Sequence, residues 1–128
     1  MSNLTVEDFF RDKADSRRLF EAVLRQVERL GDCELRVSQS QIAFRRKKNF
    51  ALVWAPGQYL KGRPTAALVL TLSFANRDPS LRWKEVTEIG PKRFTHHLEL
   101  YGKQEVDEQV FQWLQKVWDE NENEPIGA

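Results

Sequence analysis

Cysteine and histidine are scarce in this 128-residue chain, which contains one Cys and two His residues. A lone cysteine, Cys33, cannot form a disulfide within the chain, and one thiol with two imidazoles supplies too few soft ligands for a closed zinc site. Because no histidine neighbours Cys33 in the sequence, a small buried thiol fits it better than a nucleophile does. The sequence therefore predicts no metal and no other cofactor.

Long apolar segments are absent as well. Apolar runs such as residues 66–70 are far shorter than the ~20 residues that a membrane-spanning helix requires. The chain also opens without a basic and then apolar leader, because Glu7 and Asp8 follow almost at once. These absences predict a cytoplasmic protein that does not associate with membranes.

Motifs that define common enzyme classes are missing too. The sequence has no glycine-rich loop that could cradle a phosphate, no serine-centred elbow and no metal-ligand spacing. It has a globular composition, with 41% hydrophobic and 30% charged residues, in a length typical of one domain. The composition predicts a single domain, residues 1–128, and specifies no reaction.

The spacing of apolar residues predicts helices at both ends of the chain. Thr5 and Asp8 form a potential capping box, and apolar residues recur every three or four positions up to Leu30, so the N-terminal helices are expected within residues 5–30. A second amphipathic helix is expected over residues 105–118. The acidic residues 119–128 are expected to form a flexible tail.

Between these helices, residues 33–100 alternate between apolar and polar positions, which predicts β-strands. About six short strands with short, turn-rich links and no intervening helix indicate an antiparallel meander. Both amphipathic helices need an apolar partner surface. The expected fold is therefore α+β with two layers, the N-terminal and C-terminal helices packing on one face of the sheet.

The alternation also predicts which side chains lie on the open face of the sheet, away from the helices. With the Leu, Ile and Phe positions turned inward, together with Trp54, the open face has small residues in its middle and charged residues at its flanks. The predicted open-face residues are Arg36, Ala43, Arg45, Ala51, Val53, Thr71, Ser73, Thr95, His97 and Glu99. His96 has the opposite phase and is expected in the core. Such a face is compatible with an ordinary solvated surface or with a shallow platform for a ligand.

Charge is unevenly distributed, although the formal net charge is only +1. Residues 31–104 contain 13 Lys and Arg against 6 Asp and Glu, whereas residues 105–128 contain one Lys against 7 acidic residues. The densest basic segment is the predicted turn at residues 45–48. In a simple meander this turn shares one end of the sheet with Arg77 and Arg82, and the opposite end holds Lys61, Arg63, Lys92 and Arg93.

Three functions are compatible with this sequence. The leading hypothesis is a non-enzymatic binding module that binds nucleic acid or another polyanion on its basic sheet surface, through Arg36, Arg45, Arg46, Lys47, Lys48 and His97. One alternative is an enzyme in which His97 acts with Glu99 and Thr95 in acid–base chemistry. The other is a protein-interaction domain, such as a homodimer in which the acidic C-terminal segment of one chain meets the basic region of another.

Four segments together resemble a small bacterial domain of unknown function that occurs alone or as a C-terminal module. These segments are residues 16–23, 42–45, 50–54 and 96–100. The resemblance spans roughly residues 15–118. It implies a compact α+β domain from a bacterium, without an established activity, and it assigns no functional residue.

Overall fold

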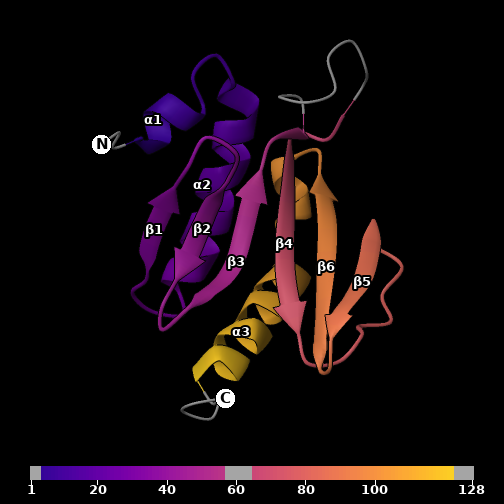
Figure 1. Ribbon diagram of the computed structural model, residues 1–128. Coiled ribbons are helices and arrows are strands. Elements are labelled where there is room, and N and C mark those ends of the chain that lie inside the picture. The colour runs from indigo at the N-terminus through magenta and orange to yellow at the C-terminus, as the bar shows by residue number, and fades with distance from the viewer. Residues whose placement is uncertain (1–3, 57–64, 123–128) are drawn as a thin grey trace.

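The computed structural model describes residues 4–56 and 65–122, and Figure 1 shows its ribbon. Over these residues, the α-helices are α1 (Val6–Phe9), α2 (Ala14–Glu28) and α3 (Glu108–Glu122), and the short helix η2 (Lys103–Glu105) is a 3₁₀-helix. The strands of the single sheet are β1 (Glu34–Val37), β2 (Ile42–Arg45), β3 (Asn49–Trp54), β4 (Leu68–Phe74), β5 (Glu85–Gly90) and β6 (Arg93–Leu100). All neighbouring strands are antiparallel, which confirms the predicted α+β class.

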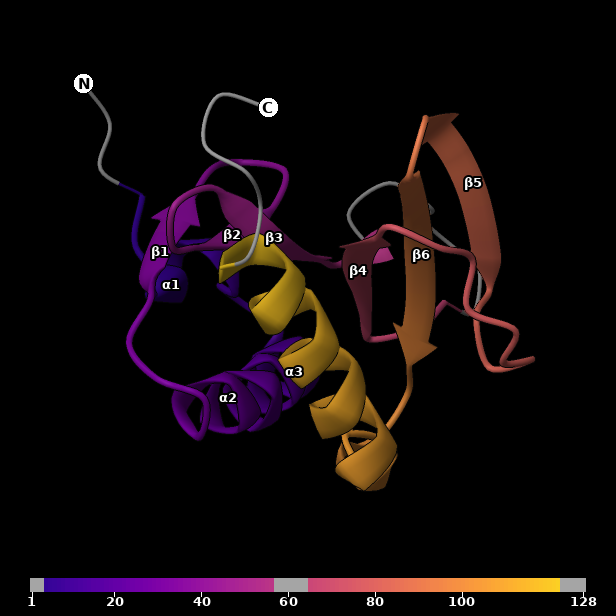
Figure 2. The same ribbon diagram turned by 90° about the horizontal axis from the view of Figure 1, so that it is seen from below.

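The helices cover one face of the sheet and leave the other face open, as Figure 2 shows. Phe20 of α2 stacks on Phe44 of β2, with 6.0 Å between the ring centroids. Trp118 of α3 meets Phe50 of β3 edge-on at 5.4 Å. Each large apolar side chain buried between the layers contributes about 1.5–3 kcal/mol to stability. The predicted two-layer arrangement is therefore confirmed, and the core lies between the sheet and the helices.

The strand order β1-β2-β3-β4-β6-β5 departs from a simple meander at its last two strands. The segment 75–84 passes along the outside of the sheet from the end of β4 to the start of β5, so that β5 forms the edge and β6 lies beside β4 (Figure 1). Trp83 of this segment packs on Trp113 of α3, with 4.2 Å between the ring centroids. The backbone N–H of Asp78 donates to His96 Nε2 at 2.9 Å. These contacts fix a connection that a meander does not contain.

A β-bulge between β2 and β3 changes which side chains of β3 face the helices. The register shifts between Phe44 and Arg45, and Phe50 has no partner across the bulge. Phe50 and Ala51 therefore both face the helices, and the alternation beyond them is reversed. The prediction for the rest of β3 is wrong: Ala51 and Val53 lie in the core, and Leu52 and Trp54 lie on the open face.

The last helix lies later in the chain than the predicted residues 105–118, because η2 occupies the first of those positions and α3 continues to Glu122. Its C-terminal end is tied to the sheet, since Glu120 Oε1 accepts a hydrogen bond from the Ala75 backbone N–H at 3.0 Å. The rest of the predicted tail, residues 123–128, lies outside the described residues. Across the described part of the chain, every helix is too short or too polar to cross a membrane.

Candidate functional site

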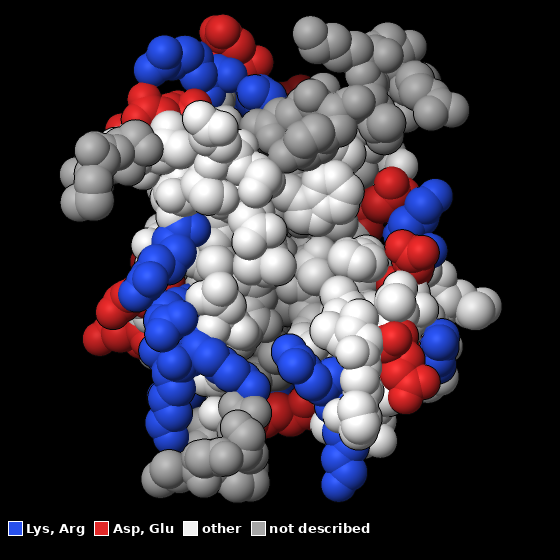
Figure 3. All heavy atoms as spheres, in the orientation of Figure 1, with Lys and Arg blue, Asp and Glu red and all other residues white. Residues whose placement is uncertain are grey.

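Cationic residues gather at one end of the sheet, which we call the basic end. They come from the β2–β3 turn, the end of β4 and the β5–β6 turn: Arg45, Arg46, Lys47, Lys48, Arg77, Lys92 and Arg93. Antiparallel pairing places the end of β2, the start of β3, the end of β4 and the start of β6 at the same edge. Lys and Arg side chains accordingly gather at the lower end of the open face in Figure 3.

The exchange of β5 and β6 brings Lys92 and Arg93 to this end. The prediction that they lie at the opposite end of the sheet, with Lys61 and Arg63, is therefore wrong. Lys61 and Arg63 themselves lie outside the described residues. Arg77 lies three residues after the end of β4, at the basic end as predicted. The basic end thus combines the β2–β3 and β5–β6 turns, which a meander would place at opposite ends of the strands.

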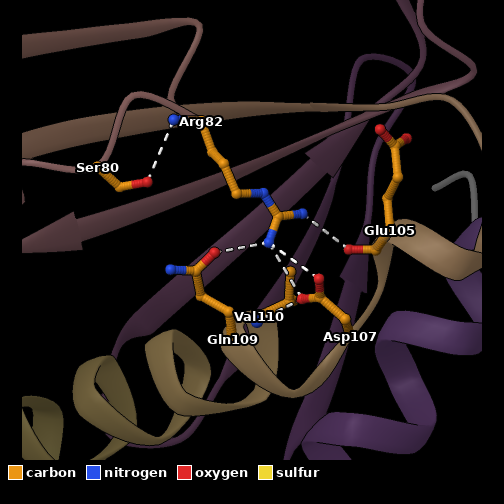
Figure 4. Close-up of polar contacts among 6 residues, drawn as sticks. All are labelled: Ser80, Arg82, Glu105, Asp107, Gln109 and Val110. Carbon is orange, nitrogen blue, oxygen red and sulfur yellow. Dashed lines mark hydrogen bonds and ion pairs between the residues drawn. The ribbon is translucent and has the colours of Figure 1, made fainter.

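Arg82, which was expected at the basic end, lies instead against the start of α3 (Figure 4). Its Nη1 donates to the Asp107 carboxylate at 3.1 Å and to Gln109 Oε1 at 2.8 Å, and its Nη2 donates to the Glu105 carbonyl at 3.0 Å. Asp107 Oδ1 also accepts from the Val110 N–H at 3.1 Å. Burial acts to raise the pKa of Asp107, but the N–H of Val110 and the Arg82 guanidinium outweigh it and lower that pKa. The Arg82 side chain therefore holds its own loop against the start of α3.

Lys92 has a backbone conformation that L-residues rarely adopt. With Pro91 it forms the turn between the paired residues Gly90 and Arg93, and its φ is +56°. The position after proline in such a turn favours glycine or asparagine, because a side chain there costs about 1–2 kcal/mol. Residues with a strained backbone are typical of functional sites. Lys92 is such a residue, and its charge lies at the basic end.

The C-terminal part of α3 lies beside the basic end. The Arg46 guanidinium lies over the Trp118 ring, 3.9 Å from its centroid. The Lys116 ammonium lies 4.9 Å from the centroid of the Phe74 ring, at the end of β4. Asp119 and Glu120 follow directly on the same helix. The acidic end of α3 and the basic end of the sheet are therefore neighbours within one molecule.

Arg36 and His97 share the open face but lie far apart on it. Cross-strand pairing puts them in one row that runs from β1 to β6 through Ala43, Leu52 and Thr71. Four strand spacings of about 4.8 Å separate them, which amounts to about 19 Å. Arg36 also forms an exposed ion pair with Glu34, at 3.5 Å. Only an elongated ligand could contact both predicted site residues.

Trp54 is an open-face residue that the sequence pattern missed. Its Nε1–H donates to Thr71 Oγ1 at 3.4 Å, and the same hydroxyl lies 2.8 Å from His97 Nδ1. Trp54 and His97 are partly exposed, whereas Thr71 is buried between them. The strand from Phe50 to Trp54 is apolar at every position, so alternation does not identify its open side. The polar run that precedes Phe50 is the one sequence signal compatible with a bulge.

The residues of the catalytic hypothesis, Thr95, His97 and Glu99, lie on the open side of β6 but do not converge. His97 interacts with Thr71, whereas Glu99 Oε1 accepts from the Tyr101 hydroxyl at 3.3 Å. The charge of Glu99 raises the pKa of Tyr101 above its ordinary value. An open pocket of about 460 Å³ borders Glu99 and Tyr101, and neither His97 nor Thr95 belongs to its lining. This arrangement does not place the three groups around one ligand atom.

His96 lies in the core, as predicted, with none of its surface exposed. Its Nε2 accepts the backbone N–H of Asp78, and its Nδ1 donates to the Phe94 carbonyl at 2.9 Å. These two bonds require the neutral imidazole, because a protonated ring has no acceptor. Burial lowers the pKa of His96 below its ordinary value and so maintains that neutral form.

Within the described residues, no three or more His, Cys, Asp or Glu side chains are placed to hold a metal ion.

Comparison with known proteins supplies a family and no activity. Residues 6–121 match the model of a protein family described as Domain of unknown function (DUF5655). The chain belongs to this family. No curated protein and no solved structure matches the chain. DUF5655 membership confirms the resemblance to an uncharacterised domain and leaves its function to be argued from the surface.

Among the described residues of the DUF5655 domain, the polar groups of one buried side chain are unsatisfied. Asn121, near the end of α3, is 4% exposed, and neither its Oδ1 nor its Nδ2 has a hydrogen-bond partner. Replacing Asn121 with the similarly shaped leucine is expected to raise the free energy of unfolding by about 1–2 kcal/mol, because it removes the cost of burying an unpaired amide. Urea denaturation measures this change. The matched control Gln115→Leu, at an exposed position of the same helix, is expected to change stability by no more than about 0.5 kcal/mol. A destabilised Asn121→Leu variant would contradict the prediction.

Proposed function

We propose that this DUF5655 domain is a non-enzymatic binding module whose basic end binds a polyanion, with nucleic acid as the best candidate. The observation that carries the proposal is the exchange of β5 and β6, which adds Lys92 and Arg93 to the cations of the β2–β3 turn. Cations brought together from separate turns can contact several phosphates of one chain.

Two further observations support this proposal. Lys92 occupies a turn position that favours glycine, so its charge is present despite a cost in backbone energy. Arg77, Lys92 and Arg93 are all exposed and can be reached by a ligand from solvent. Arg36 extends the positive surface along β1, and His97 lies farther along the open face on β6. The residues proposed from the sequence thus belong to an elongated surface.

The acidic end of α3 sets the strength of this interaction. Asp119 and Glu120 lie close enough to the basic end to lower its positive potential. A polyanion must compete with these charges, and salt screens both interactions. The proposal therefore implies moderate affinity with a strong dependence on ionic strength.

The double variant Lys92→Gln/Arg93→Gln tests the proposal. It is expected to weaken binding of a fluorescent oligonucleotide about tenfold at low salt, and to reduce the slope of log affinity against log salt by about 1.4, since each lost phosphate contact removes about 0.7 for a single strand. Fluorescence anisotropy at several salt concentrations provides both quantities.

The matched control is Lys84→Gln/Lys103→Gln, which removes the same charge from two exposed lysines away from the basic end. This control is expected to keep nearly the full affinity and slope. Equal loss in both double variants would show a general effect of net charge and contradict a site at the basic end. Passage of the unmodified protein through a heparin column at low ionic strength, without retention, would exclude the function altogether.

A further inference from the structure

We infer that the polyanion is a single-stranded nucleic acid whose bases stack on Trp54 while its phosphates contact the basic end. This inference rests on the proposed function and adds the class of ligand. It depends on how the open face divides into a charged end and an uncharged middle. The two parts require different chemical groups on one ligand.

The middle of the open face is uncharged. Cross-strand pairing places Trp54 beside Val69 of β4, and Leu52 beside Thr71. In the next row, Ser73 lies beside Thr95 of β6. Figure 3 shows this region as a surface without Lys, Arg, Asp or Glu, bordered by cations at its lower end. Phosphates gain nothing from such a surface, whereas the flat faces of bases fit it.

Trp54 offers the stacking group on this surface. Its indole nitrogen is held by Thr71 Oγ1, which also contacts His97, so the ring has a defined orientation before any ligand binds. The other tryptophans, Trp83, Trp113 and Trp118, are 6–8% exposed and pack on the helix side. Trp54 is partly exposed on the open side. An ordered, partly exposed aromatic ring on the same face as a basic region, within reach of one extended strand, is the arrangement that binds single strands without sequence preference.

The distance between the two parts also favours a single strand. Trp54 and Asn49 lie at opposite ends of β3, about 16 Å apart at ~3.3 Å per residue. An extended single strand can place phosphates at the basic end and an unpaired base on Trp54 in one pass. A duplex keeps its bases stacked inside and exposes only their edges in the grooves, which a flat sheet does not enter. Its phosphates would also lie over the uncharged middle of the face.

Binding of a short oligothymidylate by three variants tests the inference. Trp54→Leu is expected to lower affinity for the oligothymidylate by about five-fold to 150-fold, the range for loss of one base–aromatic stack. The salt dependence should stay unchanged, because no phosphate contact is lost. Trp54→Phe should retain most of the affinity. Tyr101→Leu removes an exposed aromatic ring whose hydroxyl donates to the charged Glu99 rather than lying on the uncharged surface, and it should have no effect.

Heparin separates this inference from the proposed function, because it carries negative charges but no bases. Trp54→Leu should elute from heparin at the same salt concentration as the unmodified protein. Unchanged oligothymidylate affinity in a variant that still binds heparin would overturn the stacking inference and leave the basic end intact. Absence of heparin retention in the unmodified protein would instead overturn the proposed function.

Tryptophan fluorescence supplies a second measurement that needs no variant. Oligothymidylate is expected to quench part of the emission of the unmodified protein, because a stacked base contacts Trp54, whereas heparin should leave the emission unchanged. A duplex of equal length should bind more weakly and quench less. Equal affinity for duplex and single strand, without quenching by either, would overturn the inference.

Discussion

Replacing His96 with leucine is expected to lower the free energy of unfolding by about 2–4 kcal/mol. The imidazole is fully buried and meets the rings of Phe74 and Trp83 edge-on, at 4.7 and 4.9 Å between centroids. Leucine fills part of this space but leaves the Asp78 N–H and the Phe94 carbonyl without their partner on the ring. Each buried group that loses its partner costs about 1–3 kcal/mol. Urea denaturation at neutral pH measures the loss.

The same residue gives the stability of the protein a defined pH dependence. Because the pKa of His96 is lowered in the folded state, the unfolded chain binds a proton below pH ~6.5 that the folded protein does not bind. The contribution of His96 is therefore complete above pH ~6.5 and is lost as the pH falls toward the folded-state pKa. The carboxyl groups of Asp78 and Asp107 also have lowered pKa values, so their contributions decline only below pH ~4.

The second histidine is a natural control for this prediction. His97→Gln changes a partly exposed ring on the open face and should preserve the loss of stability as the pH falls from ~6.5 toward the folded-state pKa of His96. His96→Leu should abolish it. Stability of the unmodified protein that does not change over this interval would contradict the assignment of His96 as a neutral structural residue.

The role of His96 also explains why the strand order could not be predicted from sequence. The apolar periods predicted the helices, the six strands and the two layers, because those depend on local alternation and on burial of amphipathic faces. The order of β5 and β6 depends on contacts made by segment 75–84 with distant residues. The Asp78 N–H reaches His96, and Trp83 reaches Trp113. Nothing in the segment itself specifies these partners.

Prediction of the candidate surface from sequence is limited by two features, the exchange of β5 and β6 and the β-bulge, because local alternation does not reveal them. The cations of the β2–β3 turn could be identified because they form a continuous run, but their grouping with Lys92 and Arg93 follows from the strand exchange. Simple alternation predicts Trp54 in the core, but the bulge at Phe50 reverses the phase of a strand that is apolar on both sides, so Trp54 lies on the open face. A single unpaired residue thus decides whether the open face contains an aromatic ring.

Replacing Arg82 with alanine is expected to lower the free energy of unfolding by about 2 kcal/mol, because hydrogen bonds from a charged donor are stronger than neutral ones but exposure of the ion pair weakens them. The Arg82 side chain is 29% exposed and that of Asp107 is 44% exposed, so a larger value is not expected. The loss arises at two places. The loop loses its bonds to Gln109 and the Glu105 carbonyl, and Asp107 loses the guanidinium but keeps its bond to the N–H of Val110 at the start of α3.

Two further variants separate the geometry of Arg82 from its charge. Arg82→Lys retains the charge but cannot donate in two directions from one planar group, so it should recover less than half of the loss. Arg77→Ala removes an exposed arginine from the same segment and should leave stability within about 0.5 kcal/mol of the unmodified protein. For polyanion binding the expected ranking is the opposite: Arg77→Ala should weaken binding more than Arg82→Ala. Arg77 belongs to the basic end, whereas Arg82 is bonded to the start of α3. If Arg82→Ala weakened oligonucleotide binding more than Arg77→Ala in protein that remains folded, the basic end would have to be redrawn to include the start of α3.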